Sequence, residues 1–359
     1  MKKLNFAIIG AGAGGQSMAA ILTDKGYNVK VYDINAEKIE ALKKLGKIEV
    51  TGKIEVTASP ALFTTDIKEV MTDVDAVMIV TTTDAHQDVA NKIAPYMKDG
   101  MLILLNPGHV GGALEVSQII RGQHGCKAKI MIGETADLMY ACRIAEHGHP
   151  FHSGIKKTMG VATVPATDVT EFVSVLHEAF PNLVAMKNIL ETGFEGGGAM
   201  LHPIPCFMNI NKIELGGWND YYYEGITPSI AKLIMAADAE RMAVCKALKI
   251  DAEPLVDHLG KVYNLSEYKD LYELIQHNAP YKGVKPPKNP GHRFMVEDVA
   301  CGLVPLASVG HAMGIETPVM DSFIRIASIC SGRDYATEGR TAEKLGMAGK
   351  SVEEIYKMI

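Results

Sequence analysis

The sequence is poor in the features that mark several classes of protein. Six cysteines are scattered over 359 residues without a CxxC pair, which argues against a disulfide framework and indicates thiols in a reducing compartment. The net charge of −6 argues against nucleic acid or an anionic membrane as the main partner. No segment reaches the roughly 20 uninterrupted apolar residues that a membrane span needs. We therefore expect a cytoplasmic protein with small-molecule partners.

The chain is long enough for two domains, and its apolar pattern changes between the two halves. In the first half, short apolar runs alternate with helical stretches, which predicts an α/β fold with a doubly wound, mostly parallel sheet. From about residue 185 onward, long stretches of helical period dominate. We predict an α/β domain over residues 1–185 and a mostly α-helical domain over residues 186–359. The expected strands are 4–10, 28–33, 74–81, 101–107 and 128–132, and the expected helices are 16–25, 36–45, 228–249, 253–260, 266–277, 304–313 and 318–330.

Two local patterns add detail to this outline. KIEVTG at 47–52 recurs as KIEVTA at 53–58, and two such alternating runs joined near Gly52 predict a β-hairpin or an insertion at the edge of the sheet. Ser351 and Glu354 have the spacing of a capping box, which predicts the start of a final helix.

A glycine-rich turn follows the first expected strand. Gly10, Gly12 and Gly15 form a GxGxxG motif, with a strand before it, a helix after it, and Asp33 18 residues further on. This context indicates a Rossmann dinucleotide-binding domain and speaks against a signal peptide after Met1-Lys2-Lys3. The carboxylate favours the ribose hydroxyls of NAD over the 2′-phosphate of NADP, and only Lys38 is near to hold a phosphate. The expected cofactor-binding residues are Gly10, Ala11, Gly12, Ala13, Gly14, Gly15 and Asp33, with Thr81 and His86 from the TTTDAH loop.

A single titratable side chain stands in an apolar run at the start of the second domain. His202 lies in GGGAMLHPIPCFMN (196–209), after three glycines and before two prolines. A lone histidine is commonly a hydrogen-bonded core residue, so its partner decides its role. The segment RFMVEDVACGLVP (293–305) supplies Arg293, Glu297 and Asp298, so either acidic residue could be the partner. A carboxylate beside an imidazole fixes its tautomer and favours its protonated form, which gives a proton-transfer pair.

These segments together resemble the octopine/nopaline (opine) dehydrogenases, and most of all the bacterial members that make N-(1-carboxyethyl) amino acids. The resemblance extends over nearly the whole length of the chain. It implies an NAD(P)H-dependent reductive condensation of an amino acid with a 2-oxo acid such as pyruvate, through an imine, and the reverse oxidation. The motifs that carry it are GAGAGG, NPGHVGGALE, ETADLMYACR, LHP, YEGITPS, RFMVEDVACGLVP, ETPVMD and GRTAEKLG.

The resemblance also assigns roles to residues at matching positions. It implies that His202 is the general acid/base, that Asp298 orients it, and that Arg293 holds a substrate carboxylate. Thr135 and Tyr223 are further candidate substrate contacts. The segment 194–198 (FEGGG) departs from the family, which tends to carry an asparagine there, so the amino-acid specificity stays open. A homodimer is also expected.

Two alternative functions remain at this point. The first is a 2-oxo acid reductase of the ketopantoate reductase or β-hydroxyacid dehydrogenase type. Those enzymes rely on a lysine early in the second domain, where this chain has His202, with Lys212 ten residues later. The second is a non-catalytic NAD-binding regulatory protein, which would be expected to lack His202 or Asp298.

Other signals receive a structural interpretation. HGHPFH at 147–152 lacks an accompanying cysteine or acidic ligand set, so we expect a polar loop and no metal site. Asp238, Glu240 and Arg241 are expected to form a surface network along a helix.

Overall fold

The computed structural model describes residues 3–194 and 197–359, which divide into two compact units. The first unit runs to Thr192 and includes Met358–Ile359, and the second is Gly193–Lys357. The division lies beyond the expected one at residue 185 because the segment after the last strand is tied to the first unit. The hydroxyl of Thr192 donates a hydrogen bond to the buried carboxylate of Glu134 (2.5 Å).

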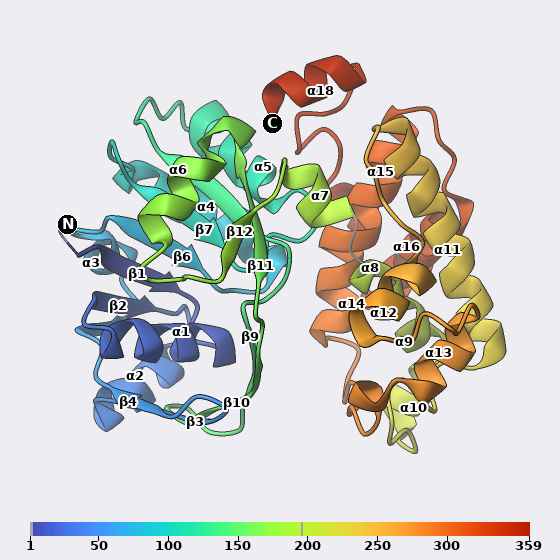
Figure 1. The fold of residues 1–359 in the computed structure, drawn as a ribbon, viewed down its shortest axis with the longest axis horizontal. Helices are drawn as coiled ribbons and strands as arrows, with labels where there is room; N and C mark the ends of the chain where they lie inside the picture. The colour runs from blue at the N-terminus through green and yellow to red at the C-terminus, as the bar shows by residue number, and fades with distance from the viewer. Residues whose placement is uncertain (1–2, 195–196) are drawn as a thin grey trace. The chain divides into compact units, whose positions relative to one another are not determined.

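The first unit is built on an eight-stranded sheet in the order β12-β11-β8-β7-β6-β1-β2-β5. All neighbouring pairs are parallel except β8 with β11, so the mostly parallel sheet expected from the sequence is confirmed. Helices α1 and α2 lie on one side of this sheet and α4 and α5 on the other (Figure 1). The strands are β1 (Asn5–Ile9), β2 (Asn28–Tyr32), β5 (Leu62–Thr64), β6 (Ala76–Ile79), β7 (Leu102–Leu105), β8 (Met131–Thr135), β11 (Met159–Val164) and β12 (Leu183–Ala185).

Helix α2 of this unit has a capping residue at each end. Helix α2 begins where the Asn35 side chain accepts a hydrogen bond from the Lys38 amide, and ends at Gly46 in the left-handed conformation (φ 66°). Strand β8 begins at Met131, so the strand expected at 128–132 was placed three residues too early. The helices are α1 (Ala13–Asp24), α2 (Ala36–Leu45), α3 (Ile67–Met71), α4 (His86–Ile93), α5 (Gly112–Ser117), α6 (Val169–Leu176) and α7 (Ile189–Phe194).

A second, smaller sheet packs against α1. The expected hairpin is confirmed as β3 (Ile48–Gly52) paired antiparallel with β4 (Val56–Ala58). The sequence did not predict its partners, β9 (Tyr140–Ile144) and β10 (Pro150–Ile155), which complete the order β4-β3-β10-β9. The expected polar loop at 147–152 is therefore wrong at its end, because β10 buries His152 completely.

The buried side chain of Gln16 connects the small sheet to the glycine-rich turn. Its amide nitrogen donates to the Ala11 carbonyl (2.8 Å), and its amide oxygen accepts from the Gly148 backbone N–H (2.7 Å). Both polar ends of one side chain in α1 are thus satisfied by the turn before it and by the loop between β9 and β10.

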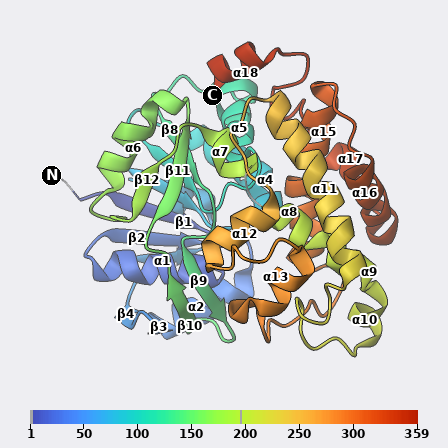
Figure 2. The same cartoon turned by 45° about the vertical axis from the view of Figure 1, so that its right-hand side comes forward.

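The second unit is helical, as expected. Helix α11, opened by the side chain of Thr227, runs beside α15 and α16 (Figure 2). Helix α13 starts later than expected because Asp270 caps it, accepting from the Glu273 amide (3.0 Å). The helices are α8 (Gly198–Leu201), α9 (Pro203–Met208), α10 (Ile210–Leu215), α11 (Pro228–Ala247), α12 (Leu255–Tyr263), α13 (Leu271–His277), α14 (Arg293–Asp298), α15 (Val304–Ala312), α16 (Pro318–Ser331), α17 (Tyr335–Glu338) and α18 (Val352–Met358).

The expected surface network on α11 is wrong, because two of its members form a buried ion pair. Asp238 and Arg241 are 1% and 0% exposed, and their charged groups are 2.7 Å apart. Arg241 also donates to the Phe194 and Glu253 carbonyls, so it joins α11 to the segments before α8 and α12. Glu240 instead accepts from two backbone amides at the start of α16.

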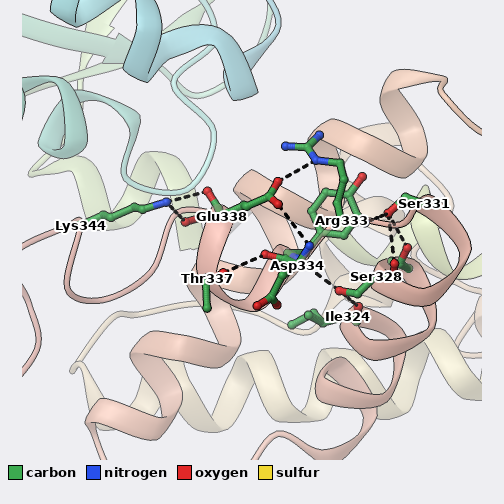
Figure 3. A network of polar contacts seen from close by, with 11 residues as sticks. Ile324, Ser328, Ser331, Arg333, Asp334, Thr337, Glu338 and Lys344 are labelled. Atoms are coloured by element: carbon green, nitrogen blue, oxygen red, sulfur yellow. Dashed lines mark hydrogen bonds and ion pairs between the residues drawn. The ribbon is translucent and has the colours of Figure 1, made fainter.

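Polar contacts link the residues that follow α16 in the C-terminal part of this unit. At the end of α16, Arg333 donates to Glu338 (2.8 Å), and the Lys344 ammonium donates to the Glu338 and Gly339 carbonyls (Figure 3). The expected capping box of α18 is confirmed, since Ser351 and Glu354 each accept from the other's backbone amide.

One helical stretch, Arg293–Ala312, has the length and mean hydropathy of a membrane span. Its most apolar window is 78% buried within the folded chain, as in a core helix of a soluble protein. Its apolar character is thus accounted for by packing inside the second unit.

Candidate active site

The glycine-rich turn between β1 and α1 has the geometry of a nucleotide cradle. Gly10 has φ +105°, a conformation that side chains rarely adopt, and a Cβ there would meet the Val80 carbonyl at 2.7 Å. A Cβ on Gly15 would lie 1.8 Å from the Gly10 carbonyl oxygen, so only glycine lets α1 pack this closely. A Cβ on Gly12 would meet nothing within 4 Å. The turn is therefore packed tightly against the protein at Gly10 and Gly15, and it leaves open space at Gly12, the N-cap of α1.

Asp33 follows β2 and closes one end of this cradle. Its Oδ2 accepts from the Ala11 backbone N–H and from the Lys38 ammonium, both at 2.7 Å, and its Oδ1 accepts from the Asn35 N–H (2.9 Å). The carboxylate is therefore held by three protein donors. It also forms an ion pair with Lys38, a contact that the sequence did not predict.

These residues fit a dinucleotide. The N-terminal end of α1 supplies backbone donors and a partial positive charge for a pyrophosphate that approaches over Gly12. After β6, the buried hydroxyl of Thr81 has no hydrogen-bond partner within residues 3–194 and 197–359, and its expected contact with the cofactor stays a prediction. Ala13 and Gly14 begin α1. His86 does not fit its expected role, because burial of its imidazole at the start of α4 leaves no ring surface for a ligand.

Thr135, expected to contact substrate, is engaged within the protein. It is completely buried at the end of β8, and its hydroxyl lies 2.8 Å from the Asp137 carbonyl and 3.1 Å from the Asn106 side-chain oxygen. The same Asn106 oxygen accepts from the Met139 backbone N–H (2.9 Å). Thr135 therefore braces the loops after β7 and β8 in this structure.

In the second unit, His202 and Asp298 lie together although 96 residues separate them. The imidazole Nδ1 is 3.1 Å from the Asp298 Oδ2, and the two side chains are 20% and 3% exposed. Because Nδ1 faces a buried carboxylate, Nε2 is the ring nitrogen left for proton transfer with a ligand.

The sequence around His202 explains how it is held. His202 is both the C-cap of α8 and the N-cap of α9. The first residue of α9 is Pro203, which has no backbone N–H, and an N–H at this position would have no partner within the helix. A Cβ on Gly197 would lie 2.1 Å from a Leu255 methyl group, so glycine there permits the close approach of α12. Glu195 and Gly196, which belong to the segment that departs from the family, lie outside the described residues.

Two aromatic side chains complete the surroundings of the imidazole. The Phe294 ring stacks on His202 with centroids 3.9 Å apart and an interplanar angle of 9°. The Tyr221 hydroxyl donates to the His202 carbonyl (2.7 Å). Burial holds the pKa of Tyr221 well above its usual value, so the hydroxyl stays protonated and remains a donor. The sequence did not predict Phe294 as a neighbour of His202, although it follows Arg293 directly.

His292, the N-cap of α14, and Arg293, its first residue, both lie beside the Phe294 ring. The Arg293 guanidinium is largely exposed and only loosely paired with Glu297 (3.8 Å), so its donors can reach a ligand. Burial, and secondly the charge of Arg293, lowers the pKa of His292, whose Nδ1 accepts from the Phe294 backbone N–H (3.3 Å).

The expected substrate contact of Tyr223 stays a prediction, because the hydrogen bonds described for this residue are made by its backbone. Its backbone N–H donates to Asp220 (3.0 Å) and its carbonyl accepts from Gln276 (3.1 Å). Its neighbour Tyr221 is the tyrosine beside His202, with ring centroids 6.4 Å apart. The second unit thus offers an imidazole oriented by Asp298, and helix α14 carries both that carboxylate and Arg293. The described residues contain no group of three or more histidine, cysteine or acidic side chains placed to hold a metal ion.

Comparisons with known proteins agree with this arrangement. Residues 185–331 match the family model of the NAD/NADP octopine/nopaline dehydrogenase α-helical domain, and residues 5–108 match that of the NAD-binding domain of 6-phosphogluconate dehydrogenase. An opine dehydrogenase of Arthrobacter sp. (strain 1C) is 36% identical over 99% of this chain and 98% of its own. The octopine dehydrogenase of Pecten maximus is 24% identical over 94% and 92%.

A solved structure shows the same fold. Octopine dehydrogenase with NADH and L-arginine aligns with a TM-score of 0.82 at 22% identity, covering 99% of this chain and 98% of that one. The similarity therefore includes both the dinucleotide-binding domain and the helical domain. On the full-length match to the Arthrobacter enzyme and the match of its helical domain, the chain belongs to the opine dehydrogenase family.

Proposed function

We propose that this protein is an NADH-dependent opine dehydrogenase that condenses an amino acid or amine with a 2-oxo acid such as pyruvate, and catalyses the reverse oxidation. The observation that carries the proposal is the contact between His202 and Asp298 in a domain of this family. The alternative reductases depend on a lysine early in the second domain, where this chain has His202, and the contact of His202 with Asp298 favours the opine dehydrogenase.

The first unit supplies the residues that would hold the cofactor. Gly10, Gly12 and Gly15 admit the pyrophosphate, Asp33 lies at the ribose end, and Thr81 offers an unused hydroxyl. Bound NADH provides the hydride that reduces the imine carbon.

His202 would transfer protons at two stages of the condensation. Its Nε2 accepts a proton from the substrate ammonium group, so that the free amine can attack the oxo-acid carbonyl. The same nitrogen then returns a proton to the hydroxyl of the adduct, which leaves as water and gives the imine. Asp298 stabilises the imidazolium between these steps and keeps Nδ1 protonated, so that both transfers use Nε2.

Arg293 would bind a substrate carboxylate. Its exposed planar fork of donors suits a carboxylate, and it lies on the helix that also carries Asp298. Relatives named for octopine and tauropine differ in their amine, so the amine partner has to be found by assay. The apolar residues around His202 favour an apolar amino acid.

The test follows NADH oxidation at neutral pH with pyruvate and a panel of amino acids. Wild-type protein is compared with His202→Ala and with His258→Ala, a histidine of the same unit that pairs with Glu253 at the surface. We expect oxidation that requires both the oxo acid and the amine, that is lost in His202→Ala and that is kept in His258→Ala.

Other results would contradict the proposal in distinct ways. Oxidation with an oxo acid alone would identify a 2-oxo acid reductase. Tight NADH binding without turnover of any pair would favour a regulatory protein. Unchanged activity in His202→Ala would remove the imidazole from the mechanism.

We also propose that the protein is cytoplasmic and a homodimer. A reducing compartment suits its scattered cysteines, and such a compartment also supplies NADH. Light scattering coupled to gel filtration would detect the dimer, and a monomer at assay concentration would contradict it.

A further inference from the structure

The backbone beside His202 lacks one helical hydrogen-bond donor. Helical hydrogen bonds lie on both sides of His202, from its N–H to the Gly198 carbonyl (3.1 Å) and from the Cys206 N–H to its own carbonyl (3.3 Å). The preceding carbonyl, that of Leu201, would accept from the N–H of residue 205 if the helix were regular. Residue 205 is a proline and has no N–H. Because Leu201 is only 5% exposed, its carbonyl needs a donor from another part of the protein.

The hydroxyl of Tyr221 takes the place of that donor. It lies 3.0 Å from the Leu201 carbonyl oxygen and 2.7 Å from the His202 carbonyl oxygen, so two consecutive backbone acceptors share its proton. The His202 carbonyl has a second donor in the Cys206 N–H. For Leu201, the hydroxyl supplies the hydrogen bond that Pro205 removes. A side chain from a different segment therefore replaces a helical hydrogen bond next to the imidazole.

Tyr221 is itself firmly held. Its side chain is completely buried, and its backbone N–H donates to the Val284 carbonyl (2.7 Å). Its ring packs against those of Trp218 and Phe294, with centroids 5.1 and 5.2 Å away. Since Phe294 also stacks on the His202 ring, Tyr221 supports both the backbone and the surroundings of the imidazole.

The position of this backbone determines where the imidazole lies. Its Nδ1 is 3.1 Å from Asp298, at the long end of the usual range for such a hydrogen bond, so a small displacement of the helix would weaken the contact. We infer that Tyr221 is a positioning residue, which holds the helix turn at His202 so that the imidazole keeps its contact with Asp298. The inference rests on the proposed function for the role of the imidazole, but not on the identity of the amine or the oxo acid.

Returning the missing donor to the helix tests this inference. In Pro205→Ala, residue 205 regains an N–H for the Leu201 carbonyl, so the hydroxyl is no longer needed there. We expect Tyr221→Phe to lower kcat by about 10- to 100-fold with little change in the KM for NADH, because misplacing a catalytic group by ~1 Å can cost ~100-fold in rate. Tyr221→Phe/Pro205→Ala should recover to within about threefold of Pro205→Ala alone. The control is Tyr335→Phe, which removes the hydroxyl of another buried tyrosine of the same unit and should keep full activity.

A second measurement needs no substrate. Protein with isotopically labelled histidine gives an imidazole NMR signal for His202, which is identified by its absence in His202→Ala. We expect Tyr221→Phe to shift this signal, because the hydrogen bond between Nδ1 and Asp298 changes. Adding Pro205→Ala should return it to its position in Pro205→Ala alone, and circular dichroism checks that each variant is folded.

Three results would overturn the inference. One is an unshifted His202 signal or an unchanged kcat in Tyr221→Phe. Another is a loss that Pro205→Ala does not recover, which would mean that the hydroxyl does not act through the helix backbone. The third is a Tyr221→Phe chain that does not fold, since the tyrosine would then support the domain as a whole. If no substrate pair is turned over, the proposed function fails, while the NMR signal still decides this inference.

Discussion

Replacing Asp298 by asparagine removes the charge beside His202 and keeps the size of the side chain. Asp298 is 2% exposed, so water cannot take over the contact at 3.1 Å from the imidazole. A hydrogen bond to a charged group contributes about 1.5–3 kcal/mol. Each 1.36 kcal/mol is tenfold in rate, so we expect kcat to fall by about 10- to 150-fold.

The assay is NADH oxidation with saturating oxo acid and amine. NADH affinity should be unchanged, because the cofactor-binding residues belong to the first unit. Asp257→Asn, which removes an exposed carboxylate of the same unit, serves as the control and should keep full activity.

A double variant separates a role through His202 from an independent one. If Asp298 acts only by orienting the imidazole, Asp298→Asn should lower kcat little further when combined with His202→Ala. Additive losses would refute the reasoning, as would a single Asp298→Asn variant that retains more than about a third of wild-type kcat, well above the range expected from one charged hydrogen bond.

Three further predictions concern the same unit. Phe294→Leu removes the ring stacked on His202, and should lower kcat with little change in the free energy of unfolding. A loss of unfolding free energy with unchanged kcat of the folded enzyme would indicate a purely structural role. Burial raises the pKa of Cys206 from 9.0 to about 12, so the folded state keeps this proton where the unfolded chain loses it. The free energy of unfolding, measured in urea, should therefore fall from about pH 9 to 12 at up to ~1.4 kcal/mol per pH unit, and Cys206→Ala should lack this part of the slope. Asp238→Ala leaves Arg241 buried and unpaired, and should cost about 3–5 kcal/mol of unfolding free energy; a loss below ~1 kcal/mol would show that the pair is not structural.

Local signals in the sequence predicted the parts of the fold that depend on short segments. The glycine turn, the helix at 36–45 and the 47–58 hairpin each follow from neighbours a few residues apart. Strand β10 was missed because its pairing with β3 joins segments about 100 residues apart, and β9 was missed with it because β9 pairs with β10. No local pattern distinguishes such strands from a polar loop.

The candidate site shows the same limit. His202 was singled out by its apolar surroundings, but its partnership with Asp298 came from the family resemblance, and only the structure places the two side chains in contact. Phe294 and Tyr221 were missed as its neighbours because aromatic residues before or within a helix are ordinarily core. Arg241 was placed at the surface because charge suggests exposure, whereas its donors are satisfied by buried carbonyls.

The bridge made by Gln16 bears on how this dinucleotide-binding domain can be redesigned. One amide side chain satisfies both the turn at Ala11 and the loop at Gly148. Trimming the small sheet to obtain a minimal cofactor-binding scaffold would therefore leave a buried amide oxygen without its donor, next to the turn that the trimming was meant to preserve. A transplant of the glycine turn into another scaffold has to carry the β9–β10 loop with it, or exchange Gln16 for an apolar residue.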